Sequence, residues 1–144
     1  MNSHTRSPGA AAPATHAPSA AGTDGAAEVL SEVLVQSDRA WNGAVYPAYP
    51  ANRPQLTVIR MTVPAHSTLP WHTHAAPNAG YVRSGHLTLE DRSSGRTKTF
   101  AAGEAFTEQM GAQHRGFTDD EPCLVVLTYA SSPDLPTSAP APDR

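Results

Sequence analysis

WHTHAAPNAGYVRSG, residues 71–85, is the stretch that decides the fold of this chain. His72 and His74 are separated by one residue, and side chains alternate between the two faces of a β-strand, so both imidazoles point to the same side. A third histidine, His114, follows about 40 residues later and reaches the same point only if the chain folds back through several strands. The pattern predicts a metal site in a small β-barrel, whose mouth is a good place for a ligand pocket.

Short segments typical of strands, separated by turn signals, surround this stretch. Gly85 marks a tight turn or a bulge, residues 91–95 form a hairpin turn, and another short strand begins at Gly103. Seven or eight short strands at regular spacing favour a sandwich or a closed barrel, and helical periodicity is missing. The segments with strand character are 56–63, 81–84, 86–90, 97–100, 113–118 and 123–130.

The two ends of the chain differ in composition from the middle. Residues 1–27 consist mainly of Ala, Pro, Ser, Thr and Gly, and such a segment buries too little apolar surface to offset the entropy lost on ordering. We therefore expect a disordered N-terminal tail. Residues 131–144 contain four prolines and are interpreted as a second, proline-rich tail. One domain then spans residues 28–130, in which residues 29–36 form a first strand or a short helical turn.

Composition and charge exclude several classes of protein. The formal net charge is −3 and the basic residues are scattered singly, which argues against binding to nucleic acid or to an anionic membrane. The longest apolar run, residues 124–127, is far too short to cross a bilayer. Residues 1–10 lack the apolar core of a secretory signal. The single cysteine, Cys123, excludes an internal disulfide framework and is expected to be a buried small hydrophobe. We expect a cytoplasmic protein.

The spacing of histidines and glycines resembles both motifs of the cupin superfamily, over residues 56–130. The first motif is His-x-His, then a glutamate, then a glycine, and it is matched by His72, His74 and Gly85. The second motif places a glycine, a Pro-x-Gly, a histidine and an asparagine at fixed intervals. Gly103, Gly111 and His114 reproduce it. Three positions depart from the motifs: Asn78 replaces the glutamate, Gln109 the proline and Thr118 the second motif's asparagine.

The resemblance implies an all-β fold, an antiparallel jelly-roll (cupin) β-barrel, that holds one divalent metal ion. The ligands would be His72, His74 and His114, and imidazole nitrogen suits Fe, Mn, Ni or Zn. Asn78, in the position of the missing glutamate, is either a neutral and weaker fourth ligand or part of a turn with Pro77. Without a carboxylate, the metal centre would keep more positive charge and favour an anionic ligand.

Glu108 is the candidate replacement for the missing carboxylate, because it has the same strand parity as Phe106 and so points inward. The second motif usually has an apolar residue there. Glu108 is a candidate fourth ligand, catalytic base or partner of a histidine N–H, and the alternative is a solvated residue at the rim. Trp71, Tyr81 and Met110 are candidates for an apolar substrate pocket, or else ordinary core residues.

These residues favour a metal-dependent enzyme of the dioxygenase type that acts on a small organic anion, with Glu108 moving the proton. The alternatives are an isomerase or lyase without redox chemistry on the same site, and a non-catalytic module that binds or senses a metabolite; a barrel without metal is a further possibility. The expected partner is a small molecule. We also expect a homodimer, with residues 29–36 supplying an edge strand.

Overall fold

Nine β-strands and no helix make up the part of the chain that the computed structural model describes, residues 27–142. The strands are β1 (Gln55–Val63), β2 (His72–Thr73), β3 (Asn78–Ser84), β4 (His86–Asp91), β5 (Thr97–Ala101), β6 (Ala105–Glu108), β7 (His114–Phe117), β8 (Cys123–Ser131) and β9 (Ala139–Pro140). The predicted disorder of residues 1–27 falls, except for residue 27, outside the described residues.

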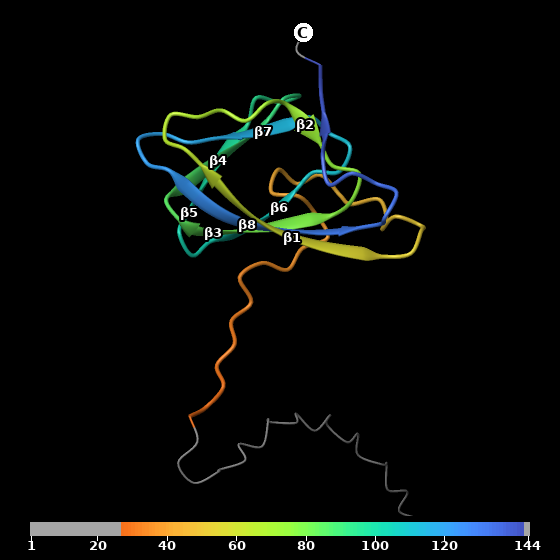
Figure 1. Cartoon of the computed structure of the whole chain (residues 1–144), viewed down its shortest axis with the longest axis horizontal. Coiled ribbons are helices and arrows are strands. Elements are labelled where there is room, and N and C mark those ends of the chain that lie inside the picture. The colour runs from red at the N-terminus through yellow and green to blue at the C-terminus, as the bar shows by residue number, and fades with distance from the viewer. Residues whose placement is uncertain (1–26, 143–144) are drawn as a thin grey trace, which may run out of the picture. The chain divides into compact units, whose positions relative to one another are not determined.

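The strands form two antiparallel sheets that lie face to face (Figure 1). One sheet has the order β1-β8-β3-β6, and the other has the order β5-β4-β7-β2-β9. Apart from the consecutive pair β4 and β5, most neighbours in each sheet are far apart in the sequence, as in the pairing of β1 with β8. This arrangement confirms the predicted all-β jelly roll. It also brings β2, β6 and β7, which carry the candidate site residues, to one region between the sheets.

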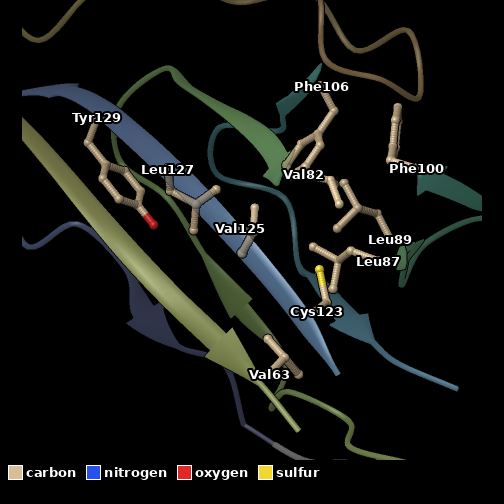
Figure 2. Packing of buried hydrophobic residues seen from close by; sticks show 10 residues of the cluster. All are labelled: Val63, Val82, Leu87, Leu89, Phe100, Phe106, Cys123, Val125, Leu127 and Tyr129. Atoms are coloured by element: carbon tan, nitrogen blue, oxygen red, sulfur yellow. The ribbon is translucent and has the colours of Figure 1, made fainter. Parts of the chain in front are cut away.

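The hydrophobic core lies between the two sheets and follows from alternation along the strands. In β8 every second residue is buried, from Cys123 through Val125 and Leu127 to Tyr129. Leu87 and Leu89 of β4 face this row from the other sheet, as Figure 2 shows. Burial of such side chains stabilises the fold by about 25 cal/mol for each Å² of apolar surface removed from water. The remaining core residues are Val63, Val82, Phe100 and Phe106.

Gly85 directly follows β3, next to a register shift between Val82 and Ser84 in the pairing of β3 with β8, and the sequence predicts a turn or bulge there. Its φ of 73° is a left-handed conformation that glycine adopts at no steric cost. A Cβ there would lie 3.1 Å from Cα of Cys123 and closer still to the carbonyl oxygen of Pro122. This position therefore excludes a side chain both by its conformation and by its surroundings.

The two ends of the described chain behave differently from each other. Residues 29–36 form neither strand nor helix, and Leu30 and Val33 are exposed. Residues 32–142 belong to one compact unit. Within the region expected to be a second tail, β9 pairs with β2 at the edge of the five-stranded sheet. Proline is tolerated in a short edge strand because its missing N–H faces no partner.

Candidate metal centre

Three histidines and one glutamate meet between the two sheets. His72 on β2 is the direct antiparallel partner of His114 on β7, and His74 follows one residue after β2. Glu108 ends β6 in the opposite sheet. Their candidate ligand atoms all lie within 4.8 Å of one another, and the ring centroids of His72 and His114 are 4.5 Å apart. The structure therefore brings together the three predicted histidines and the predicted carboxylate.

Each imidazole is oriented by a backbone carbonyl at Nδ1. The distances are 2.9 Å from His72 to Pro70 O, 2.7 Å from His74 to Thr137 O, and 2.9 Å from His114 to Ala112 O. A carbonyl oxygen only accepts hydrogen bonds, so Nδ1 carries the proton in all three rings. In a neutral ring Nε2 is then left as a free lone pair, which is the state in which imidazole binds a metal.

Glu108 lies against these Nε2 atoms. Its Oε2 is 3.0 Å from Nε2 of His74, and its Oε1 is 3.7 Å from Nε2 of His114. Neither contact has hydrogen-bond geometry, so within residues 27–142 both buried Nε2 atoms lack a hydrogen-bond partner. Buried polar atoms are normally satisfied. Two orphaned Nε2 atoms beside a buried carboxylate are donors that suit a divalent transition metal, so the residues present fit the expected ion.

Burial and charge act against each other on these groups. Burial lowers the pKa of His74, but contact with Glu108 outweighs it, so the pKa of His74 is raised. Burial raises the pKa of Glu108, but His74 and the two other imidazoles lower it below its ordinary value. His114 is further from the carboxylate, and burial lowers its pKa to about 4. The contact between His74 and Glu108 therefore favours the charged form of both groups.

Asn78 and Glu108 are neighbours on two adjacent strands. Asn78 is the direct partner of Glu108 in the β3–β6 pairing and of Tyr129 in the β3–β8 pairing. Paired residues share a face, so all three side chains point to the interior. The amide of Asn78 is buried, and within the described residues neither its oxygen nor its nitrogen has a hydrogen-bond partner. The buried carboxylate of the cluster thus belongs to β6. The cupin motif has its glutamate on the neighbouring strand, β3, at the position of Asn78.

A cavity of about 300 Å³ opens beside the four side chains. Tyr129 lines it, with its ring centroid 5.5 Å from that of His74. Burial, followed by the charge of Glu108, raises the pKa of Tyr129 to about 12. Tyr129 is not among the residues predicted from the sequence, although it belongs to the row of inward-facing residues in β8. The other lining residues are Ile59, Met61, Leu69, Pro70, His72, His74, Leu87, Leu89, Glu108, Gly116, Leu127, Thr137, Ser138 and Pro140.

The three residues predicted to line the pocket lie elsewhere. Trp71 has the opposite parity to His72, and its ring lies under the guanidinium groups of Arg115, at 4.2 Å, and Arg92, at 5.1 Å. Tyr81 is 38% exposed because it alternates with buried neighbours on β3. Met110 follows β6 and is only half-buried. None of these three residues borders the cavity in the described part of the chain.

The chain is similar to one protein family and to several solved structures. The cupin-domain family model matches residues 59–129. The solved structure of the polyketide cyclase RemF from Streptomyces resistomycificus is similar, with a TM-score of 0.54 and 20% identity over 65% of this chain and 65% of the cyclase. The DMSP lyase DddQ from Ruegeria pomeroyi DSS-3 has a TM-score of 0.54 and 16% identity over 61% of this chain and 45% of the lyase. The chain thus spans less than two thirds of either structure, and at these identities the likeness concerns the fold. No curated protein matches the chain.

Proposed function

Because the chain belongs to the cupin superfamily, we propose that it is a divalent-metal enzyme that acts on a small organic anion. The observation that carries this proposal is the cluster of His72, His74, His114 and Glu108, whose ligand atoms lie within 4.8 Å of one another beside a cavity. A bound metal would supply a Lewis acid, and iron or manganese would add redox chemistry with dioxygen.

Glu108 is the proposed fourth ligand, in place of the glutamate that the first cupin motif would have at Asn78. Its two oxygens face two different histidines, so one oxygen can bind the metal while the other accepts a proton. Asn78 lies directly opposite and is left as a neutral neighbour of the carboxylate. Three neutral imidazoles, one carboxylate and a divalent ion carry one net positive charge. A substrate with a single anionic group would neutralise it.

The cavity wall limits the substrate further. Among the described residues that line the cavity, none is Lys or Arg, and more than half are apolar. A dicarboxylate or a phosphate would leave a charge buried without a partner, which is costly. A cavity of about 300 Å³ is at the small end of ligand pockets. The proposed substrate class is therefore a small monoanion, such as an enolate, a carboxylate or a thiolate, with an apolar body.

We place dioxygenase-type oxidation first among the reaction classes. The aliphatic wall formed by Ile59, Met61 and Leu127 would exclude water from the reacting atoms, and Glu108 would accept the proton of an enolisable or thiol substrate.

A second candidate, an isomerase or lyase without redox chemistry, is favoured by Tyr129. Its hydroxyl keeps its proton at neutral pH because its pKa is raised to about 12. Glu108 and Tyr129 would then serve as proton acceptor and donor on the same cavity.

The test uses the full chain purified without an affinity tag. We expect one equivalent of metal per chain, lost in His74→Ala, and we expect oxygen uptake with pentane-2,4-dione or 3-mercaptopropionate. Hydrogen exchange of the dione in D₂O without oxygen uptake would assign the proton-transfer reaction. Bound metal and a bound probe without turnover would assign a binding or sensing module. A chain without metal would refute the proposal.

Glu108→Gln separates the roles of the carboxylate. A weakened hold on the metal identifies a ligand, and a retained metal with slow turnover identifies a base. Glu121→Gln, at an exposed position, is the matched control and should change neither quantity.

An exposed apolar sheet edge supports the proposal of a homodimer. β1 is at the edge of its sheet, and its outward residues Leu56 and Val58 are 77% and 67% exposed. We propose that residues 29–36 of one copy cover this edge in another copy. Val58→Lys should then convert a dimer to a monomer in light scattering after gel filtration, and an unchanged mass would refute the proposed dimer.

No helix within residues 27–142 is long and apolar enough to cross a membrane. The cytoplasmic location stays a prediction.

A further inference from the structure

The C-terminal strap, which we define as residues 137–142, is fastened to the five-stranded sheet along β2. β9 pairs with β2, and the N–H of Ala141 donates to the carbonyl of Trp71 at 2.9 Å. Nη1 of Arg92 donates to the carbonyl of Pro142, also at 2.9 Å. Figure 1 shows this last segment, in dark blue, running beside β2. The attachments through Trp71 and Arg92 involve residues that do not line the cavity.

The same strap also contacts the candidate metal centre. The carbonyl of Thr137 accepts the Nδ1–H of His74 at 2.7 Å, and Thr137, Ser138 and Pro140 form part of the cavity wall. The two other histidines are oriented by carbonyls only two residues away in the sequence. The acceptor for His74 is 63 residues away. His74 alone therefore depends on a distant part of the chain for its orientation.

The strap is held weakly compared with the strands of the core. None of residues 137–142 is buried, and β9 has only two residues. Segments with few buried apolar contacts open locally at a small fraction of the global unfolding free energy. Detachment of the strap would remove the hydrogen bond that orients His74 and would open one wall of the cavity. The site would lose both features together, while the two sheets stay folded.

We propose that the docked strap completes the metal centre, and that Arg92 is a positioning residue that acts through it. This proposal rests on the proposed metal function. Arg92 also donates to Gln113 at 2.8 Å and lies over the ring of Trp71. It is thus fixed to the sheet and holds the end of the strap from outside. Groups that orient a metal-bound histidine typically contribute 10–100-fold to metal affinity.

Chelator competition with Co²⁺, followed by the absorption of the bound ion, tests the proposal in the full chain. Removal of residues 136–144 should weaken Co²⁺ binding about 10–100-fold, and Arg92→Ala should weaken it in the same direction by a smaller factor. Arg115→Ala is the matched control, because Arg115 also stacks on Trp71 but has no hydrogen bond to the strap in the described residues. Equal affinity in the full chain, the truncated chain and Arg92→Ala would overturn the proposal.

A second measurement needs no metal. The Nδ1–H resonance of His74 in the metal-free protein should be protected from solvent exchange in the full chain and in Arg115→Ala. It should exchange faster in the truncated chain and in Arg92→Ala, and equal protection would refute the strap's role. If the truncated chain does not fold, Arg92→Ala carries both measurements. If the full chain binds no Co²⁺ but the exchange pattern appears, the proposed metal function fails while the positioning of His74 stands.

Discussion

Gly80→Ala tests whether the pairing of β3 with β6 holds the candidate centre in place. Gly80 is the direct partner of Phe106, two residues from the pair formed by Asn78 and Glu108. A Cβ on Gly80 would lie 2.6 and 2.8 Å from two ring carbons of Phe106 and nearer still to a third. Real Cβ atoms do not approach this closely, so the ring must move.

The ring has little freedom to move. Phe106 is 1% exposed and packs against Phe100, with ring centroids 5.0 Å apart. Forcing a methyl group into such a core costs about 1–3 kcal/mol, and we expect that loss in the free energy of unfolding of Gly80→Ala. Phe106→Leu removes the clash. The double variant should therefore be more stable than the sum of the two single changes predicts, by about 1 kcal/mol.

Urea unfolding at equilibrium measures all four members of this cycle, provided that the slopes agree. Ala79→Val, on the outward face of the same strand, is the control and should stay within about 0.5 kcal/mol of the unmodified chain. Because a shift of β3 against β6 also moves Glu108, Gly80→Ala should weaken Co²⁺ binding, and the double variant should restore part of it. Strictly additive free energies, or an unchanged Gly80→Ala, would refute the reasoning.

Three further predictions concern other parts of the fold. Gly85→Ala should lower the free energy of unfolding by about 1–3 kcal/mol more than Gly103→Ala does. Both glycines have positive φ, but only a Cβ at position 85 would meet backbone atoms. Equal urea midpoints for the two variants would contradict this. Although burial raises the pKa of Asp91, hydrogen bonds from two serines lower it below 3.8. The stability deficit of Asp91→Asn should thus be full at pH 7 and shrink as the pH falls through the folded pKa, and a deficit independent of pH in urea titrations would count against it. Burial raises the pKa of Cys123, so its thiol should react with a disulfide reagent only as fast as the chain unfolds, and rapid labelling of the native protein would show otherwise.

The strand pattern and the histidine cluster were predictable because both depend on alternation. His72 and His74 share a face by their spacing alone, and the turns at Gly85 and Gly111 bring the later strands back toward them. The same reasoning fixes the inward direction of Glu108. These inferences need only the period of two and the positions of turns, which the sequence displays directly.

The C-terminal strap and the true cavity wall were not predictable in this way. A segment with several prolines has no strand pattern, and its pairing with β2 depends on where the sheet edge lies. The sequence suggests Trp71 as a residue of an apolar mouth, but its parity places it on the outer face beside Arg115. Tyr129 lines the cavity because of the register between β8 and β3. Register and edge position are properties of the assembled sheets.

The carbonyl groups that orient the three histidines have a practical consequence for engineering. They belong to the backbone, so no single side-chain change at Pro70, Ala112 or Thr137 deletes an acceptor. Libraries that vary wall residues such as Ile59 and Met61 would therefore alter which molecules fit, while the imidazoles keep their tautomers. In this scaffold, selectivity can be evolved separately from the proposed binding of a metal ion.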